Sequence, residues 1–234
     1  SSTGKQKVEN QLGKTEAVKC FALAEESKAL LESRIKQHKI DCDLTWGYMH
    51  AIPKAHQMDE LKAWRDEYEG LGVKGLSLFS KPELEQRLGT TIYHGALRES
   101  EAGHLHPLNY CLGLARAAIK SGAVIDENSR VTEVNRGSSP WARAEHGMVK
   151  AKFMVVAGNA YLGRTVKALY GRVMPVASYI IATEPLGENL AKSLIANNEA
   201  VANTNFIVDY FRRSNDHRML FGGRASYSTF EPPN

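Results

Sequence analysis

The sequence predicts a mixed α/β, or α+β, fold in which strands and helices do not alternate strictly. Amphipathic helical segments and short segments rich in β-branched residues occur along the whole chain of 234 residues. After residue 76 the strands are not evenly separated by helices, which argues against a purely doubly wound parallel sheet. The strands also fall into two groups, one within residues 123–157 and one formed by the others, so we expect two layers of strands.

Helical periodicity identifies the predicted helices. Their apolar residues recur every three or four positions, with charged residues between them. Ser80 followed by Glu83 is a capping-box pattern, which starts one further short helix. The other predicted helices cover about residues 13–38, 54–69, 107–121 and 188–196, with a short helix that ends near residue 170.

Short segments rich in β-branched and aromatic residues predict the strands. Gly70–Gly75 is expected to be a turn, and Gly103–Pro107 a loop. The predicted strands cover residues 42–52, 76–79, 92–98, 123–125, 130–135, 142–145, 148–157 and 173–183, and a hairpin is expected from residues 205–212 and 219–224.

The composition is ordinary for a globular protein and excludes several classes. Hydrophobic residues make up 43% of the chain, and no apolar run approaches the roughly 20 residues that cross a bilayer. The first residues have no apolar segment behind them, so no signal peptide is expected. A formal charge of +4 is too small to indicate nucleic acid. We therefore expect neither a membrane nor a nucleic acid as a partner.

The three cysteines, Cys20, Cys42 and Cys111, are odd in number and widely spaced. This argues against a disulfide framework and against a structural zinc site. We expect three buried, unpaired thiols and a reducing cytoplasm as the compartment.

Two glycine-rich segments resemble phosphate-binding motifs. Gly70–Gly75 matches Gly-x-Gly-x-x-Gly, but a predicted helix precedes it and a strand follows, so it is better interpreted as a helix stop. Gly158–Thr165 nearly matches a P-loop after a predicted strand, but Arg164 stands where that motif requires Lys. Three interpretations stay open: a P-loop-like nucleotide binder, a tight strand-to-helix turn, and a turn whose backbone approaches a cofactor diphosphate.

His104 and His106 could lie on one face of an extended segment. A metal site would need a third ligand, and the sequence nominates none, so no metal is expected. A histidine that closes a pocket or caps the following helix is the preferred interpretation.

The final hairpin carries a cluster of basic residues. Strand alternation sends Tyr210 and Arg212 to one face and Arg213 to the other. One interpretation is a solvated basic edge that discourages strand pairing. The other is an arginine that binds a substrate carboxylate through two hydrogen bonds, beside the Gly222–Gly223 pair, where a flat ring could approach the backbone. No Gly-x-Ser-x-Gly elbow and no His-Glu-x-x-His helix supports hydrolase chemistry.

Several stretches together, in this order along nearly the whole chain, resemble one family, the FAD-dependent amino acid and amine oxidoreductases of the D-amino acid oxidase type. Within it the chain is most similar to members that oxidise gamma-glutamylputrescine. The stretches are residues 40–43 before 46–48, then 103–109, 155–163, 174–176, 183–186, 209–212 and 220–223.

The resemblance implies an FAD-binding domain interleaved with a substrate domain, which is built on a mixed, mainly antiparallel sheet flanked by helices. Family members open with a strand, Gly-x-Gly-x-x-Gly and a helix, and a later segment of their sequence covers the flavin. The chain shows neither of these two segments. We therefore expect it to be a fragment that is inactive alone. The expected divisions are a linking helix at 1–40, substrate domain at 41–102, part of the FAD-binding domain at 103–165, and substrate domain at 166–234.

The resemblance also implies site residues, although it assigns no catalytic side chain. The predicted FAD contacts are Val131, Ala157, Gly158, Gly222 and Gly223, and the predicted substrate contacts are Tyr210, Arg212 and His106.

The implied reaction is oxidation of a C–N bond of a small amine, such as one derived from putrescine, to an imine and then an aldehyde, with hydrogen peroxide as co-product. The alternatives are a catalytically silent substrate-binding module and the P-loop-like nucleotide binder.

Overall fold

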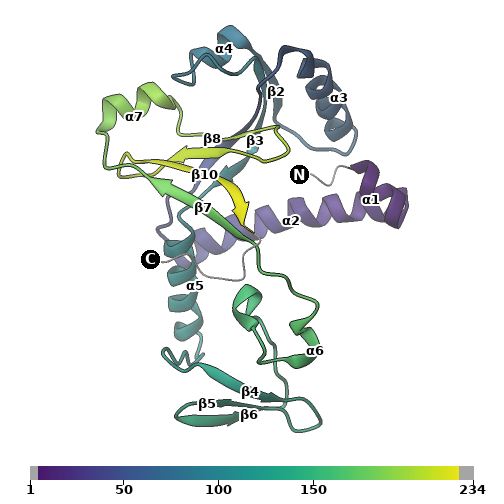
Figure 1. Cartoon of the computed structure of the whole chain (residues 1–234), viewed down its shortest axis with the longest axis vertical. Coiled ribbons are helices and arrows are strands. Elements are labelled where there is room, and N and C mark those ends of the chain that lie inside the picture. The colour runs from purple at the N-terminus through teal and green to yellow at the C-terminus, as the bar shows by residue number, and fades with distance from the viewer. Residues whose placement is uncertain (1–4, 227–234) are drawn as a thin grey trace. The chain divides into compact units, whose positions relative to one another are not determined.

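The structure is a computed structural model that describes residues 5–226, and it divides into two compact units (Figure 1). Unit 1 comprises Ser1–Ser121 and Tyr179–Arg224, and unit 2 comprises Gly122–Ser178 and Ala225–Asn234. These boundaries do not coincide with the divisions expected at residues 103 and 166. The assignment of those residues to cofactor-binding and substrate domains stays a prediction.

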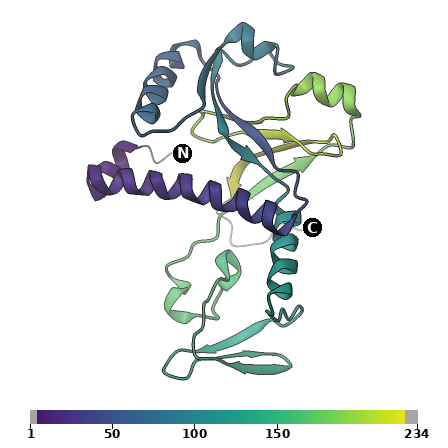
Figure 2. The same cartoon turned by 180° about the vertical axis from the view of Figure 1, so that it is seen from behind.

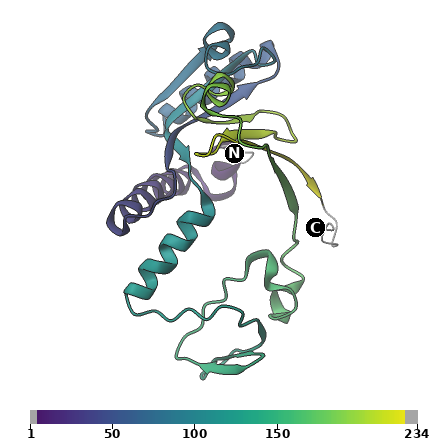
Figure 3. The same cartoon turned by 90° about the vertical axis from the view of Figure 1, so that its left-hand side faces the viewer.

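A seven-stranded sheet organises unit 1, in the order β2-β3-β1-β8-β9-β10-β7. β1 and β8 are parallel, whereas the pairs β2–β3, β3–β1, β8–β9 and β9–β10 are antiparallel, so the predicted mixed, mainly antiparallel sheet is confirmed. β7 and β10 run side by side at one edge (Figure 3). The strands are β1 (Thr45–Ile52), β2 (Leu76–Ser80), β3 (Gly95–His104), β7 (Ala177–Ala182), β8 (Ala200–Asn203), β9 (Tyr210–Arg213) and β10 (Met219–Ser226).

Helices flank this sheet. α2 extends beside β1 and β3 (Figure 2), and α3 packs Leu61 and Trp64 against Ile52 and Leu97 of the sheet. The helices are α1 (Lys5–Leu12), α2 (Lys14–His38), the 3₁₀ helix η1 (Ala55–Gln57), α3 (Met58–Glu69), α4 (Lys81–Glu85), α5 (Pro107–Lys120) and α7 (Glu188–Leu194). The capping box predicted at Ser80 is confirmed, because Glu83 accepts hydrogen bonds from the Ser80 backbone and hydroxyl.

The core of unit 1 lies on one face of β1. Alternation along this strand buries Met49 and Ala51, which pack with Leu84, Ile195 and Val201. Tyr48 and His50 lie on the opposite face and are partly buried. The sheet therefore has a closed apolar face and a second face on which polar side chains reach a cavity.

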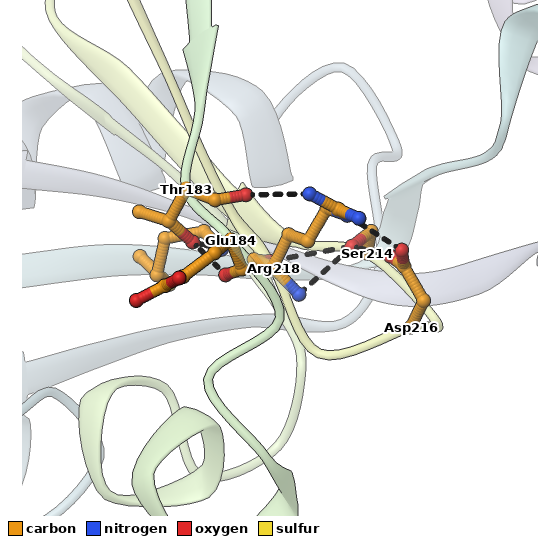
Figure 4. A network of polar contacts seen from close by, with 6 residues as sticks. Thr183, Glu184, Ser214, Asp216 and Arg218 are labelled. Atoms are coloured by element: carbon orange, nitrogen blue, oxygen red, sulfur yellow. Dashed lines mark hydrogen bonds and ion pairs between the residues drawn. The ribbon is translucent and has the colours of Figure 1, made fainter.

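A polar network closes the turn between β9 and β10 (Figure 4). Asp216 accepts hydrogen bonds from Ser214 Oγ and from Arg218 Nε, and the two bonds, in that order of effect, lower the pKa of its carboxyl. Arg218 Nη1 donates to the Thr183 carbonyl at 2.9 Å, and the Thr183 hydroxyl accepts from Met219 N at 3.1 Å. This network ties the end of β7 to the start of β10.

Unit 2 contains a small antiparallel sheet in the order β4-β5-β6. Its elements are β4 (Val131–Asn135), β5 (Trp141–Ala144), β6 (Gly147–Lys150), the 3₁₀ helix η2 (Asn159–Leu162) and α6 (Lys167–Tyr170). The expectation of two separate sets of strands is thus confirmed.

Several predicted element bounds were wrong. Residues 123–125 and 151–157 form no strand, and Phe153 and Val155 are 88% and 89% exposed. Their apolar pattern resembles a strand, but no partner among the described residues pairs with it. β3 continues to His104 because it pairs with β1 as far as Thr45, so the loop predicted from Gly103 begins later.

Two further differences concern burial and a missing strand. β8 was not predicted, because its four residues are too few for a visible alternation. Cys42 is buried as expected, but Cys20 and Cys111 are exposed, so the prediction of three buried thiols was wrong. Within residues 5–226, no helix combines the length and apolar character needed to cross a membrane.

Candidate functional site

Unit 1 holds a cavity of about 220 Å³ on the polar face of its sheet. Its wall combines apolar side chains such as Ile180, Ala200 and Leu220 with a few polar groups. Six elements contribute to it, because β1, β8, β9 and β10 lie next to one another, β7 follows β10 at the edge and supplies Ile180, and His104 ends β3. The polar groups are Tyr48, His104, Tyr210 and Arg212.

Arg212 is the cationic group of this cavity. Its Nη1 lies 3.2 Å from His104 Nδ1 and donates to the Arg213 carbonyl at 3.3 Å, while Nη2 donates to the Leu105 carbonyl at 3.3 Å. No carboxylate among residues 5–226 forms an ion pair with it. Burial lowers the pKa of Arg212, but the group stays cationic because arginine titrates far above neutrality. Arg212 is therefore a partly buried cation that can bind a carboxylate.

The neighbouring residue Arg213 points away from the cavity. It is buried on the other face of β9, and its Nη2 donates to the Ala196 carbonyl at 3.3 Å. β9 is an internal strand between β8 and β10. The predicted alternation is confirmed, and the interpretation as a solvated basic edge was wrong.

His104 contacts both Arg212 and the backbone. Its Nε2 lies 2.7 Å from the Asn198 carbonyl oxygen, on the side of the ring opposite to Arg212. Burial is the main reason that the pKa of His104 is lowered, and the positive charge of Arg212 adds to the effect. The imidazole is therefore held neutral at neutral pH.

The structure places the predicted substrate contact His106 at the start of α5. Its Nδ1 accepts a hydrogen bond from Asn109 N at 3.3 Å, which satisfies one free N–H of the first helical turn. His106 does not line the cavity, whereas Tyr210 and Arg212 do. The part of the chain that the structure describes has no group of three His, Cys, Asp or Glu side chains suited to a metal.

The glycine pair on β10 is tightly packed against this chain's own residues. A Cβ on Gly222 would overlap the ring of Tyr210, and a Cβ on Gly223 would stand 2.9 Å from Asp209 Oδ1. Gly222 lines the cavity, and the next residue, Gly223, is buried. The flat ring that approaches Gly222 in this structure is thus the side chain of Tyr210.

Unit 2 has its own cavity, of about 390 Å³, which brings together the other predicted cofactor contacts. Val131, Ala157 and Gly158 all line it. No strand precedes Gly158, and the 3₁₀ helix η2 follows directly, so Gly158–Thr165 lacks the strand–loop–helix context of a P-loop.

The lining of this cavity fits a dinucleotide cofactor such as FAD. Arg130 and Arg164 provide positive charge, which suits a diphosphate. Val155 and Tyr161 line the same cavity, are 89% and 92% exposed, and offer apolar surface to flat rings.

Sequence reasoning missed Tyr48 as a cavity residue, and it did not assign which of His104 and His106 closes a pocket. Alternation along β1 could have placed Tyr48 on the face opposite to Gly47, Met49 and Ala51, which are buried. His104 could not be distinguished from His106, because that choice depends on where β3 ends.

Comparisons with known proteins give a consistent result. Residues 5–234 match the family model described as FAD dependent oxidoreductase. The chain is 36% identical over 222 residues to a probable oxidoreductase OrdL of Haemophilus influenzae, covering 92% of this chain and 52% of that protein. It is 34% identical over 226 residues to the gamma-glutamylputrescine oxidoreductase of Escherichia coli, covering 96% and 53%. The chain thus spans about half the length of these relatives.

Solved structures share the fold. The glycine oxidase of Bacillus cereus superposes with a TM-score of 0.73 at 15% identity, covering 91% of this chain and 58% of that one. The glycine oxidase of Geobacillus kaustophilus gives a TM-score of 0.69 at 20% identity, covering 90% and 56%.

Proposed function

This chain belongs to the FAD-dependent oxidoreductase family, and from that premise we propose that the protein oxidises a C–N bond of a small amine that also carries a carboxylate. Arg212 carries the proposal, because it is a partly buried cation in an otherwise largely apolar cavity and has no carboxylate partner among the described residues. A γ-glutamyl amine has both required groups, and similarity to gamma-glutamylputrescine oxidoreductase supports it.

We assign FAD as the cofactor and place its contacts at Val131, Ala157 and Gly158 in unit 2, with Gly222 and Gly223 as the proposed contacts in unit 1. The charge and apolar character of the unit 2 cavity support this assignment. When bound, FAD would supply the acceptor for the two electrons removed from the C–N bond, and hydrogen peroxide would be the co-product if oxygen reoxidised it. Water then splits the resulting imine to an aldehyde and an amine or ammonia.

The residues of this chain position the substrate. Arg212 holds the distal carboxylate, and Tyr210 and Leu220 provide surface along the apolar part of the substrate. Excluding water from this cavity strengthens the ion pair and favours the neutral amine, which is the form that is oxidised. The chemistry therefore needs orientation from the protein more than an acidic or basic side chain.

A putrescine-derived substrate would place the protein in polyamine breakdown. The cytoplasm is the proposed compartment, supported by an odd number of widely spaced cysteines.

The test compares Arg212→Lys with Arg213→Lys in the full-length, flavin-loaded protein. Arg212→Lys removes the planar fork that binds a carboxylate through two bonds, so KM for a γ-glutamyl amine should rise about 10- to 100-fold. Arg213→Lys changes the adjacent residue on the opposite face and should leave KM unchanged. The same diamine without its glutamyl group is the control substrate, and Arg212→Lys should not alter its KM.

Flavin content is measured in parallel and should be equal in both variants. An unchanged KM for the γ-glutamyl amine in Arg212→Lys would rule out the carboxylate-binding role.

A further inference from the structure

His104 links the Arg212 guanidinium to a fixed backbone carbonyl, and we propose that it is a positioning residue that leaves one edge of Arg212 free for a carboxylate. The inference rests on the proposed carboxylate-binding function and deepens it. Its two supporting contacts are Nε2 to the Asn198 carbonyl oxygen at 2.7 Å and Nδ1 to Arg212 Nη1 at 3.2 Å.

The two partners determine the tautomer of His104. A carbonyl oxygen only accepts hydrogen bonds, so we assign the imidazole proton to Nε2, which donates to Asn198. Nδ1 then carries a lone pair and accepts a hydrogen bond from Arg212 Nη1. The opposite tautomer would place two donors against each other at Arg212 and two acceptors against each other at Asn198.

The same contacts determine which part of Arg212 stays available. A guanidinium has five N–H groups. Nη1 donates two hydrogen bonds, to His104 Nδ1 and to the Arg213 carbonyl. Nη2 donates one, to the Leu105 carbonyl. The Nε–H and one Nη2–H have no hydrogen-bond partner among residues 5–226, and the atoms Nε and Nη2 lie on one edge of the planar guanidinium. This edge can bind both oxygens of a carboxylate at once.

The carbonyl that orients His104 belongs to the residue that precedes a buried charge cluster. Asn198 has a left-handed backbone, with φ of 55°, and precedes Glu199, which is 2% exposed. Glu199 forms ion pairs with Arg98 and, at 3.7 Å, with Arg87. Gly47 leaves the space that the Glu199 side chain occupies, since a Cβ there would stand 2.8 Å from Glu199 Oε1.

Protonation of His104 would end this arrangement. The charged groups that act on the ring are Arg212 of β9, which opposes protonation, and Asp43 of the segment before β1, which favours it. A protonated ring has donors at both nitrogens, so Nδ1 would face an Arg212 N–H and the hydrogen bond would be lost. Carboxylate binding should therefore weaken as the pH falls below the ordinary histidine range.

The kinetic test uses the full-length, flavin-loaded protein with His104→Leu, His104→Gln and His94→Gln. His104→Leu removes the acceptor, so KM for a γ-glutamyl amine should rise about tenfold with kcat little changed. Glutamine has one donor and one acceptor and should recover most of this loss. His94→Gln, away from the residues that line the cavity, should behave as the unaltered protein.

The pH profile distinguishes positioning from a structural role. KM of the unaltered protein for the γ-glutamyl amine should rise below pH 6.5, the ordinary histidine value, because burial lowers the pKa of His104. The His104→Gln profile should lack that rise. The diamine without the glutamyl group should show no difference between the two proteins, which separates this effect from titration of the amine.

A second measurement does not depend on activity or on the variants folding. Nitrogen NMR of the unaltered protein should show His104 as the neutral tautomer with the proton on Nε2. Observation of the Nδ1–H tautomer would overturn the inference. So would a normal KM in His104→Leu together with a raised KM in Arg212→Lys, a result that leaves the proposed function intact. If neither variant changes KM, both the inference and the proposed function are wrong.

Discussion

The ring of Tyr210 packs directly against Gly222 on the neighbouring strand, in the space that a Cβ would occupy. Both residues line the unit 1 cavity. The conformation of Tyr210, and with it the shape of the cavity, therefore depends on the absence of a side chain at position 222.

Gly222→Ala should displace the Tyr210 ring and reshape the cavity. Overpacking of this kind costs about 1–3 kcal/mol of unfolding free energy, and affinity for a γ-glutamyl ligand should fall with it. Urea unfolding and calorimetry measure the two effects. Gly171→Ala is the control, because its φ of −81° suits alanine and nothing lies within 4 Å of the added carbon. Combining Gly222→Ala with Tyr210→Leu should cost less than the sum of the two changes, and strict additivity would contradict the packing described.

The Glu199 cluster should make a large contribution to stability. Arg98→Met leaves a carboxylate that is 2% exposed with only the longer ion pair to Arg87. Breaking a buried ion pair in this way costs about 3 kcal/mol or more. Lys62→Met, which removes the exposed Lys62–Asp59 pair, is the control and should cost less than about 1 kcal/mol in the same urea titration. Equal losses in the two variants would show that the Glu199 carboxylate is hydrated.

The His50–Glu99 pair should make stability depend on pH in the acid range. His50 Nε2 lies 2.9 Å from Glu99 Oε1, and this hydrogen bond is the main reason that the pKa of Glu99 is lowered below 4.5. A lowered carboxyl pKa contributes stability above pH 4.5, and that contribution is lost as the pH falls through the folded-state value.

Unfolding free energy should therefore decline less between about pH 5 and pH 3 in Glu99→Gln than in the unaltered protein. Glu101→Gln, an exposed neighbour on β3, should follow the unaltered protein. Parallel curves for all three proteins would contradict the proposed contribution of Glu99.

Ala157→Leu tests the flavin contacts in unit 2. Ala157 is exposed and lines the cavity, so leucine fills that space without disturbing a packed core. Retention of FAD, measured as flavin absorbance per protein and as the dissociation constant, should weaken about tenfold or more. Ala160→Leu changes an exposed alanine that does not line the cavity and should retain FAD normally. Equal retention in both variants would place the cofactor elsewhere.

His106→Ala and His106→Asn separate two possible roles of this histidine. Alanine removes the helix cap and should cost about 1 kcal/mol, whereas asparagine is a good cap and should restore most of that stability. Thermal unfolding measures this difference. Reduced affinity for a γ-glutamyl ligand in the asparagine variant would support the predicted substrate contact, since the cap is present there.

Local pattern predicted the elements whose stability is local. The helix expected at 13–38 corresponds to α2 (Lys14–His38), because helical spacing of apolar residues marks it in the sequence. The prediction that Arg212 and Arg213 lie on opposite faces of the strand is also confirmed, because successive side chains of any strand point to opposite faces. These features follow from neighbours in sequence.

Features set by distant partners could not be predicted in this way. β8 is a strand because β1 and β9 pair with its two sides. Val155 has an apolar, β-branched side chain but lies in no strand, since no described segment pairs with it. His104 reaches the cavity because β3 pairs with β1 as far as Thr45. Glu199 would be expected on a surface, and its burial depends on Arg87, Arg98 and the space at Gly47.

The pairing of β1 with both β3 and β8 has a consequence for how the chain folds during synthesis. β1 is complete once Ile52 is synthesised, and it can pair with β3 once His104 is synthesised. Its other edge has no partner until β8 (Ala200–Asn203) leaves the ribosome. The β4-β5-β6 sheet needs only local contacts and can close in between. Loop closure over so long a separation is slow, so this edge of β1 stays unpaired and open to chaperones and to aggregation until β8 is synthesised.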